Sequence, residues 1–304
     1  MERKDRIDLF GGTVLVVFSA LLGLNQVMVK LVNAGLQPVF QAGLRSVCAF
    51  LPVLLYALFM RKRLSISDGS FWPGVLCGVF FAGEFMLLFS ALEFTTVSRA
   101  SVFFYTMPFW VALVGHFIIP GERLTPLRLG GLVLAIVGVA LALSGRSGTL
   151  PETVIIGDIM CLLAACGWAG IALVARTTSL SRSSPEMQLL YQLAVSAVIL
   201  VPASLFFGDW IRDMTPVLAG IFAFQVLVVV GVGFLTWFWI LSIYPASDMA
   251  SFSFLAPLFG VLLGWLILDE TITGAVALAL VLICCGIVMV NYKPRVRPPV
   301  SADA

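Results

Sequence analysis

The sequence predicts an all-α integral membrane protein with ten transmembrane helices, built as two inverted five-helix repeats with both termini in the cytoplasm. Three observations predict this fold: an apolar composition, a series of apolar stretches of membrane-spanning length, and a polar pattern that occurs twice. Of the 304 residues, 61% are hydrophobic and 11% are charged, whereas a soluble domain has roughly 25% charged residues. Most of the protein surface must therefore face lipid.

A helix needs about 20 apolar residues to cross the hydrocarbon core of a bilayer. The first apolar stretch follows a charged start but is too long for the apolar part of a secretory signal, so we interpret it as a retained span. The ten predicted spans cover residues 11–32, 38–60, 71–92, 98–119, 127–144, 154–175, 186–207, 215–241, 246–268 and 274–292. The last residues, 293–304, are rich in proline and arginine and predict a disordered cytoplasmic tail.

The distribution of basic residues predicts the orientation. Thirteen of the 18 lysine and arginine residues fall on the side of the N-terminus and three on the opposite side, while Lys30 and Arg45 lie within spans. Because basic loops stay in the cytoplasm, the N-terminus is predicted to be cytoplasmic, and an even number of spans returns the C-terminus to the same side. We expect a multi-pass protein of the bacterial inner (plasma) membrane.

A pattern of polar and small residues occurs in spans 4–5 and again in spans 9–10. The matched pairs are Pro108 with Pro257, Gly115 with Gly264, Glu122 with Glu270, and Thr125 with Thr273, with a one-residue slip at Pro120. Apolar helices resemble one another in leucine and valine, but here the matches are Pro, Gly, Glu and Thr, which indicates a true repeat. Both glutamates are expected to cap the helices that follow them.

The repeat divides the chain into residues 1–148, residues 149–292 and the tail 293–304. Because each unit holds an odd number of spans, the second copy is inverted relative to the first. Inverted repeats around a site at the membrane midplane are a recurring plan of secondary transporters, in which two similar halves alternate the side to which the site opens.

The repeated pattern, with ten spans in about 300 residues, resembles the EamA family of the drug/metabolite transporter superfamily. Within that family the chain is most similar to the YddG-type exporters of amino acids, including aromatic ones. The resemblance covers nearly the whole chain. It implies export of amino acids and related small metabolites, and a central cavity lined by spans 1, 3, 4, 6, 8 and 9.

Glu84 in span 3 is the sharpest single candidate, because an ionisable group inside a span is costly and often functional. It could bind a substrate ammonium or carry a coupling proton; alternatively, it forms a structural pair with Lys30 or Arg45. Either of these cations could instead bind a substrate carboxylate. Asn25, near the middle of span 1, is a candidate ligand contact.

Aromatic residues at cavity depth could form apolar walls around a substrate, although ordinary packing explains any one of them. These candidates are Tyr105, Trp168, Trp237, Phe252 and Phe254. Pro108 and Pro257 lie near the middle of their spans, where a proline removes a backbone donor. The functional interpretation is a pair of kinks that shape the cavity and act as a gate, and the alternative is an ordinary bend.

Several classes of function and partner are excluded or disfavoured. A net charge of +2 argues against nucleic acid, and a single histidine with cysteines only in apolar runs predicts no metal site and no cofactor. No phosphate-binding loop is present, so ATP is not the direct energy source. The expected partners are a small-molecule substrate and the lipid bilayer. The sequence leaves the oligomeric state open and is compatible with a monomer.

The leading hypothesis is a secondary transporter that exports amino acids, with apolar or aromatic ones favoured, by alternating access. The main alternative is a carrier of a lipophilic cation, a sugar or a nucleotide derivative. A cation carrier should depend on Glu84 and aromatic residues, whereas an amino acid carrier should also need Lys30 or Arg45. A channel lacks the expected polar lining, and an intramembrane enzyme lacks a nucleophile with its base, or a metal.

Overall fold

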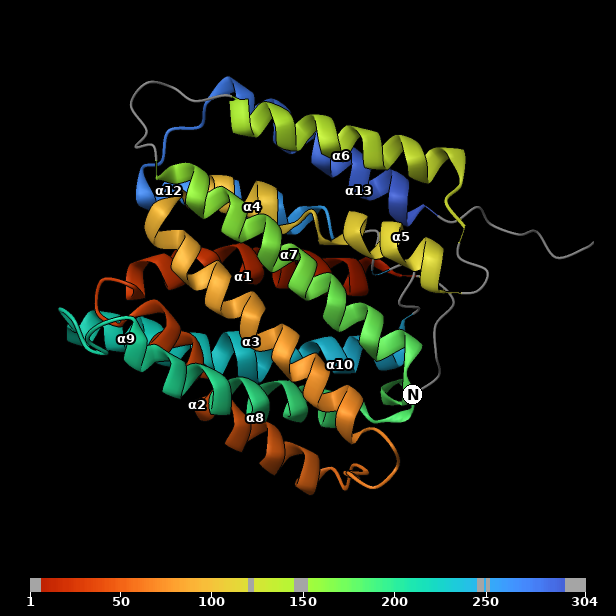
Figure 1. Cartoon of the computed structure of the whole chain (residues 1–304), viewed down its shortest axis with the longest axis vertical. Coiled ribbons are helices and arrows are strands. Elements are labelled where there is room, and N and C mark those ends of the chain that lie inside the picture. Colours follow the sequence, from red (N-terminus) through yellow and green to blue (C-terminus); the bar gives the residue numbers. More distant parts are fainter. Residues whose placement is uncertain (1–6, 120–122, 145–152, 245–248, 250–251, 293–304) are drawn as a thin grey trace, which may run out of the picture.

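The computed structural model describes residues 7–119, 123–144, 153–244, 249 and 252–292, and the described chain is helical (Figure 1). The first half of the chain forms α1 (Leu9–Val32), α2 (Pro38–Phe59), α3 (Phe71–Phe94), α4 (Val97–Phe104), α5 (Met107–Ile118) and α6 (Pro126–Ser144). The second half forms α7 (Val154–Thr177), α8 (Pro185–Ala203), α9 (Pro216–Phe224), α10 (Gly233–Ile243), α12 (Leu255–Leu268) and α13 (Gly274–Asn291). Short 3₁₀ turns, η1 (Ser179–Arg182) and η2 (Ser204–Phe206), flank α8.

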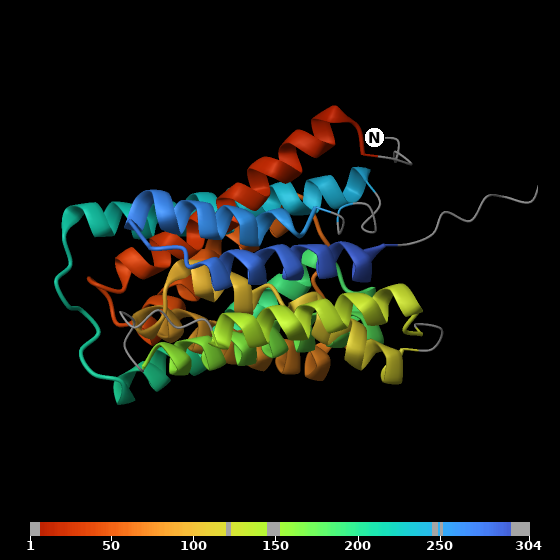
Figure 2. The ribbon, with the colours of Figure 1, turned by 90° about the horizontal axis from the view of Figure 1, so that it is seen from above.

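Eight helical stretches in the described chain are long and apolar enough to cross a membrane, and two shorter apolar stretches accompany them. Each of the ten predicted spans contains helix, while the number of spans that cross the bilayer stays a prediction. The helices run roughly side by side, and the start of α1 and the end of α13 lie at the same end of the bundle in both views (Figures 1 and 2).

Turn residues and prolines set where several helices begin. Pro185 and Pro216 each occupy the first position of a helix, where the missing N–H would have had no partner. The hydroxyl of the preceding residue, Ser184 or Thr215, accepts a hydrogen bond from a backbone N–H of the first turn. The breaks between apolar stretches therefore follow from ordinary capping chemistry.

The fourth predicted span is two helices, because the chain breaks at Tyr105 and Thr106 between α4 and α5. The Thr106 hydroxyl donates to the Phe103 carbonyl over 2.6 Å, so part of the freed backbone is satisfied locally. Pro108 lies in the first turn of α5, and Pro257 lies in the first turn of α12. Both prolines thus begin a helix after a break, a position that tolerates their missing N–H; a gating role for them stays a prediction.

The eighth predicted span contains a π-helical segment, η3 (Gln225–Val232), between α9 and α10. A π-helical segment is less favourable than α-helix and often occurs at functional sites, because it re-aims side chains within a span. It places Gln225 against α2, as described below.

The last spans of the two predicted halves, α6 and α13, pack with their backbones in close contact. A Cβ added at Gly131 would lie 2.8 Å from the Gly286 carbonyl oxygen, and one added at Gly286 would lie 2.7 Å from the Gly131 carbonyl oxygen. Gly138 faces the Ala279 carbonyl oxygen in the same way, at 3.1 Å. The alignment that matches Thr125 with Thr273 also matches Gly131 with Ala279 and Gly138 with Gly286. The repeat therefore converts the contact of Gly131 with Gly286 into that of Gly138 with Ala279, and the reverse.

A buried ion pair joins α4 to α7. The Arg99 guanidinium donates to both carboxylate oxygens of Asp158, with the shortest distance 2.5 Å, and also to the Ala142 carbonyl oxygen at 2.8 Å. The Thr95 hydroxyl adds a third group, donating to Asp158 over 2.7 Å. Both charged side chains are at most 2% exposed. A pair buried so deeply needs this many hydrogen bonds to compensate for its lost hydration.

We predict that Gly286→Ala lowers the thermal stability of the purified protein in detergent, because the new methyl group must displace the Gly131 backbone. Overpacking of this kind costs about 1–3 kcal/mol. Gly220→Ala on α9 is the matched control, because a Cβ there meets no atom within 4 Å. Equal melting temperatures for the two variants would contradict the close contact of α6 with α13.

We predict that Asp158→Ala is strongly destabilising, because it leaves the Arg99 cation buried without its partner. Loss of one member of such a pair costs about 3–5 kcal/mol. The double variant Arg99→Met with Asp158→Leu removes both charges and should melt above the single variant. The measurement is the melting temperature in detergent; a double variant less stable than Asp158→Ala would show that the pair does not act as a unit.

Candidate functional site

Aromatic rings from the end of α4 and from α7 pack together, and two rings of α3 belong to the same core. The rings of Phe104 and Trp168 stack with centroids 4.9 Å apart, and Tyr105 meets Trp168 edge-on at 5.9 Å. Phe85 on α3 contacts Phe89 at 5.5 Å in the same core. The break after Phe104 therefore sets two aromatic residues against α7, so these rings can surround an apolar group.

Two opposite charges lie beside these rings. The Arg45 guanidinium, on α2, lies 4.2 Å from the Phe85 ring centroid and 4.8 Å from that of Phe89. Glu84 precedes Phe85 on α3, and the charges of Arg45 and Glu84 interact electrostatically. Yet no ion pair within 4.0 Å joins these two described residues, and Glu84 Oε2 is buried without a hydrogen-bond partner. The residues are 5% and 4% exposed, so neither charge is compensated by bulk water.

Glu84 also lies against α7. A Cβ added at Gly167 would lie 3.3 Å from the Glu84 Cβ, so the glycine makes room for the acid next to Trp168. Tyr105 interacts electrostatically with the same carboxylate. Four of the predicted site residues, Arg45, Glu84, Tyr105 and Trp168, are thus brought together by α2, α3, α7 and the end of α4.

Uncompensated amides extend this polar region. Gln41, one helical turn before Arg45, donates its Nε2 to Gln225 Oε1 over 3.3 Å, while Gln41 Oε1 and Gln225 Nε2 are buried without partners. Asn25 Oδ1 on α1 is also buried and unpartnered. A buried polar atom without a partner costs about 1–3 kcal/mol, so the paired amides of Gln41 and Gln225 are suited to bind a polar ligand or water.

Three predicted cavity residues lie elsewhere. Trp237 stacks on Phe18 of α1 with centroids 5.2 Å apart, and both Trp237 and Phe252 pack on an apolar cluster near the start of α1. Phe254 packs against the main core, where its carbonyl oxygen lies 3.6 Å from the Cys284 thiol. None of the three joins the rings around Trp168 in the described contacts.

Lys30 does not pair with Glu84, which was one predicted alternative. Its ammonium donates to the Thr95 carbonyl oxygen over 2.6 Å and lies 3.5 Å from Glu270 Oε1. The expectation that Glu270 caps the helix after it is wrong: Glu270 caps α4, and Thr273 caps α13. The α13 cap needs only a hydroxyl at the preceding residue, which leaves Glu270 free to reach the neighbouring helix. Glu122 lies outside the described residues.

Sequence reasoning missed Asp158 and counted Arg99 among the three basic residues on the side opposite the N-terminus. The signal for Asp158 was available, because it is an acid inside a predicted span and such a group needs a partner. Nothing local in the sequence indicates that its partner is Arg99, since the two residues lie in different halves of the chain. Among the described residues, no group of three or more His, Cys, Asp and Glu side chains could hold a metal ion.

The arrangement can bind a small amphiphilic ion. The guanidinium of Arg45 suits a carboxylate, Glu84 suits an ammonium group, and the rings suit an apolar side chain.

Comparison with known proteins agrees with a transport role. The EamA-like transporter family matches residues 9–144 and again residues 155–292. The chain is 29% identical over 315 residues to a protein of Escherichia coli (strain K12) named "Probable amino-acid metabolite efflux pump", covering 100% of both chains. It is 26% identical over 284 residues to "Uncharacterized transporter YoaV" of Bacillus subtilis (strain 168), covering 91% of this chain and 95% of the relative.

A solved crystal structure shares the fold, with a TM-score of 0.62 at 20% sequence identity over 92% of this chain and 94% of that one. The two family matches cover nearly the whole described chain, and relatives named as transporters align with it from end to end. The protein is therefore a membrane transporter and not an enzyme, and it belongs to the EamA-like transporter family.

Proposed function

We propose that this protein exports amino acids with apolar or aromatic side chains, together with related small metabolites, by alternating access around the Arg45–Glu84 site. The carrying observation is that a buried guanidinium and a buried carboxyl group interact electrostatically, beside a group of aromatic rings, without forming an ion pair. A zwitterionic amino acid has the complementary charges and an apolar side chain.

The chemistry of each group assigns its role. Arg45 stays charged even in an apolar environment and presents a planar set of donors that matches a carboxylate. Glu84 has one oxygen without a partner, available to an ammonium group. The Phe104, Tyr105 and Trp168 rings then contact the substrate side chain.

The cost of the unpaired site supports a ligand. A purely structural pair would be expected to close into a hydrogen-bonded contact, as Arg99 and Asp158 do. Arg45 and Glu84 instead keep apart inside the protein, which is unfavourable unless something else binds between them at some stage of the cycle. A substrate that supplies both missing charges would explain the arrangement.

The relatives support the substrate class. The efflux pump of Escherichia coli named above, and a protein of the same name in Salmonella typhimurium at 28% identity over 310 residues, are named for amino-acid metabolites. The proposal includes ten spans in two inverted halves, with both termini in the cytoplasm of a bacterial inner membrane. The exchange of contacts between α6 and α13 under the repeat supports that inverted relation.

We predict that the purified protein in proteoliposomes catalyses counterflow of labelled apolar and aromatic amino acids. The panel should include sugars and lipophilic cations, each with and without an imposed proton gradient. Counterflow of amino acids alone supports the proposal. Transport of a lipophilic cation without any amino acid would contradict the substrate class, and would favour a carrier that uses Glu84 and the rings but not Arg45.

We predict that Glu84→Gln reduces amino acid counterflow by at least about tenfold, because loss of a buried charged partner removes more than 1.4 kcal/mol of binding. Asp209→Asn is the control, since it removes one acidic charge from an exposed side chain in the loop before α9. Arg45→Gln should cause a similar loss. If Glu84→Gln keeps counterflow but loses proton-driven accumulation, Glu84 carries the coupling proton and does not bind the ammonium group.

A further inference from the structure

A buried carboxylate from the second half of the chain caps a helix of the first half. Glu270, in the loop between α12 and α13, accepts hydrogen bonds from the Val97 N–H (2.7 Å), the Ser98 N–H (2.8 Å) and the Ser98 hydroxyl (2.8 Å) at the start of α4. The Lys30 ammonium, in the last turn of α1, lies 3.5 Å from the same carboxylate. We call Glu270 with these partners the clasp.

The clasp is part of a larger set of contacts at one end of the bundle. Lys30 also donates to the Thr95 carbonyl oxygen, and the Thr95 hydroxyl donates to Asp158. Three ion pairs among the described residues lie at this end: Lys30–Glu270, Arg99–Asp158 and Glu93–Arg212. Each of them joins the first half of the chain to the second, so separating the halves at this end breaks all three.

Close packing accompanies the clasp. A Cβ added at Gly264 would lie 2.8 Å from Glu270 Oε2 and 3.1 Å from Ser98 Oγ, and one added at Gly260 would overlap Ser101. A Cβ added at Gly157 would lie 2.8 Å from the Thr95 Cβ. These contacts bring α4 against α12, and α3 against α7, with no room for a substrate to pass.

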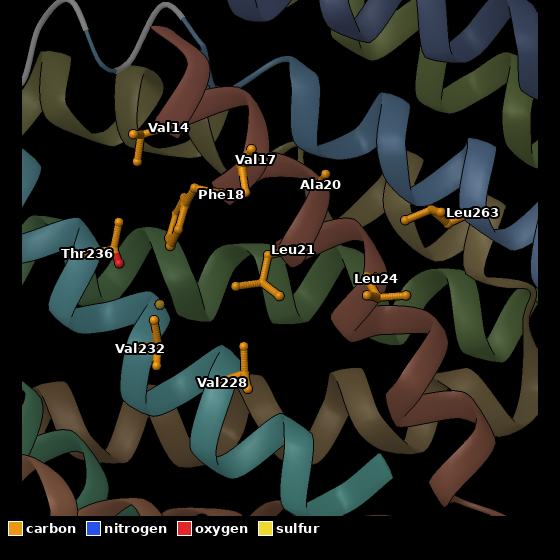
Figure 3. Close-up of a pocket in the computed structure, with 11 residues that line it drawn as sticks. Val14, Val17, Phe18, Ala20, Leu21, Leu24, Val228, Val232, Thr236 and Leu263 are labelled. Carbon is orange, nitrogen blue, oxygen red and sulfur yellow. The ribbon is translucent and has the colours of Figure 1, made fainter. Parts of the chain in front are cut away.

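The contact between α1 and α10 is looser along the middle of α1. A groove of about 450 Å³ runs between α1, η3, α10 and α12, and Figure 3 shows its apolar lining, including Phe18, Leu21 and Val232. Under the repeat, span 1 (α1) corresponds to span 6 (α7), and span 8 (α9 to α10) corresponds to span 3 (α3). The contact of α1 with α10 therefore corresponds to the contact of α7 with α3. The two corresponding contacts therefore differ along their length. The contact of α3 with α7 is closely packed beside the clasp, whereas α1 is separated from α10 by the groove along its middle and packs closely against Tyr244 at Gly11.

From the buried contacts of Glu270, which join the two halves at this end, we infer that the clasp is a gate, which holds the transporter shut at the Lys30 end and must break for substrate to pass there. The inference rests on the proposed transport function but assigns its own residues. Glu270 acts by position and charge, without touching the Arg45–Glu84 site in the described contacts. Rupture leaves the amino end of α4 and the Lys30 ammonium exposed to water entering from that end.

The test uses Glu270→Gln. The glutamine side chain has the same shape but replaces one acceptor oxygen with an NH₂ group, which cannot accept a hydrogen bond from the N–H and hydroxyl donors of α4. It also removes the negative charge that attracts the Lys30 ammonium. The gate should therefore open more often. Cys161, one turn after Asp158 on α7, is a native reporter, because its thiol is 0% exposed and interacts electrostatically with Lys30 and Asp158.

The readout is the rate at which a charged methanethiosulfonate reagent labels Cys161 in the full-length protein in lipid nanodiscs, measured by mass spectrometry of peptides. We expect Glu270→Gln to raise this rate by roughly tenfold or more, as a shift toward the open state requires. The labelling experiment uses no substrate, so its result does not depend on whether the proposed amino acids are transported. An unchanged rate at Cys161 would overturn the gate.

Three controls separate opening from other causes. Asp269→Asn makes the same change one residue away, on an exposed side chain whose backbone φ of 51° asparagine tolerates. Lys62→Gln breaks the Lys62–Glu186 ion pair, which also joins the two halves but lies at the opposite end. Both should label like the wild type. Cys77, buried on α3 at 0% exposure, reports unfolding; if its labelling rises together with that of Cys161, Glu270 has a structural role only and the gate is rejected.

Discussion

An uncompensated charge inside a membrane protein is costly, and this constraint explains how the buried charges of this transporter are arranged. Arg99 and Asp158 form a directly hydrogen-bonded ion pair, and Glu270 takes three hydrogen bonds besides its contact with Lys30. These groups join helices. Arg45 and Glu84 are equally buried but are not joined to each other, and that difference distinguishes a candidate binding site from a structural contact.

The two halves of the chain meet through contacts of two kinds. Glycine contacts between α6 and α13 bring the two backbones together, and the repeat converts each contact into the other. Such a symmetric contact can stay unchanged while the rest of the two halves moves. The contact of α3 with α7 and that of α1 with α10 also correspond under the repeat. The first is closely packed beside the clasp, whereas the second is closely packed at Gly11 and Tyr244 and separated by a groove along the middle of α1. A carrier with inverted halves is expected to show this asymmetry in any one state, since each half takes the shape that the other takes in the opposite state.

Much of the fold could be predicted because apolar length depends only on local sequence. The exact partners could not, because they connect distant segments: Glu270 was expected to cap its own following helix, and it caps α4 instead. Depth in the membrane was a usable signal for Glu84, Tyr105 and Trp168. The same signal placed Trp237, Phe252 and Phe254 at the cavity, yet depth does not tell which face of a helix a residue occupies. Trp237 and Phe252 pack on a cluster near the start of α1, and Phe254 packs on the main core with no described ring contact to Trp168.

The central claim is that Arg45 and Glu84 together bind a zwitterion, and the most direct test is the binding of three ligands of similar size to the purified protein by calorimetry. The ligands are phenylalanine, 3-phenylpropionate, which lacks the ammonium group, and 2-phenylethylamine, which lacks the carboxylate. The account predicts that phenylalanine binds at least about tenfold more tightly than either analogue, because each analogue leaves one buried charge unpaired. Equal binding of phenylalanine and 2-phenylethylamine would contradict it, because Arg45 would then have no part in recognition.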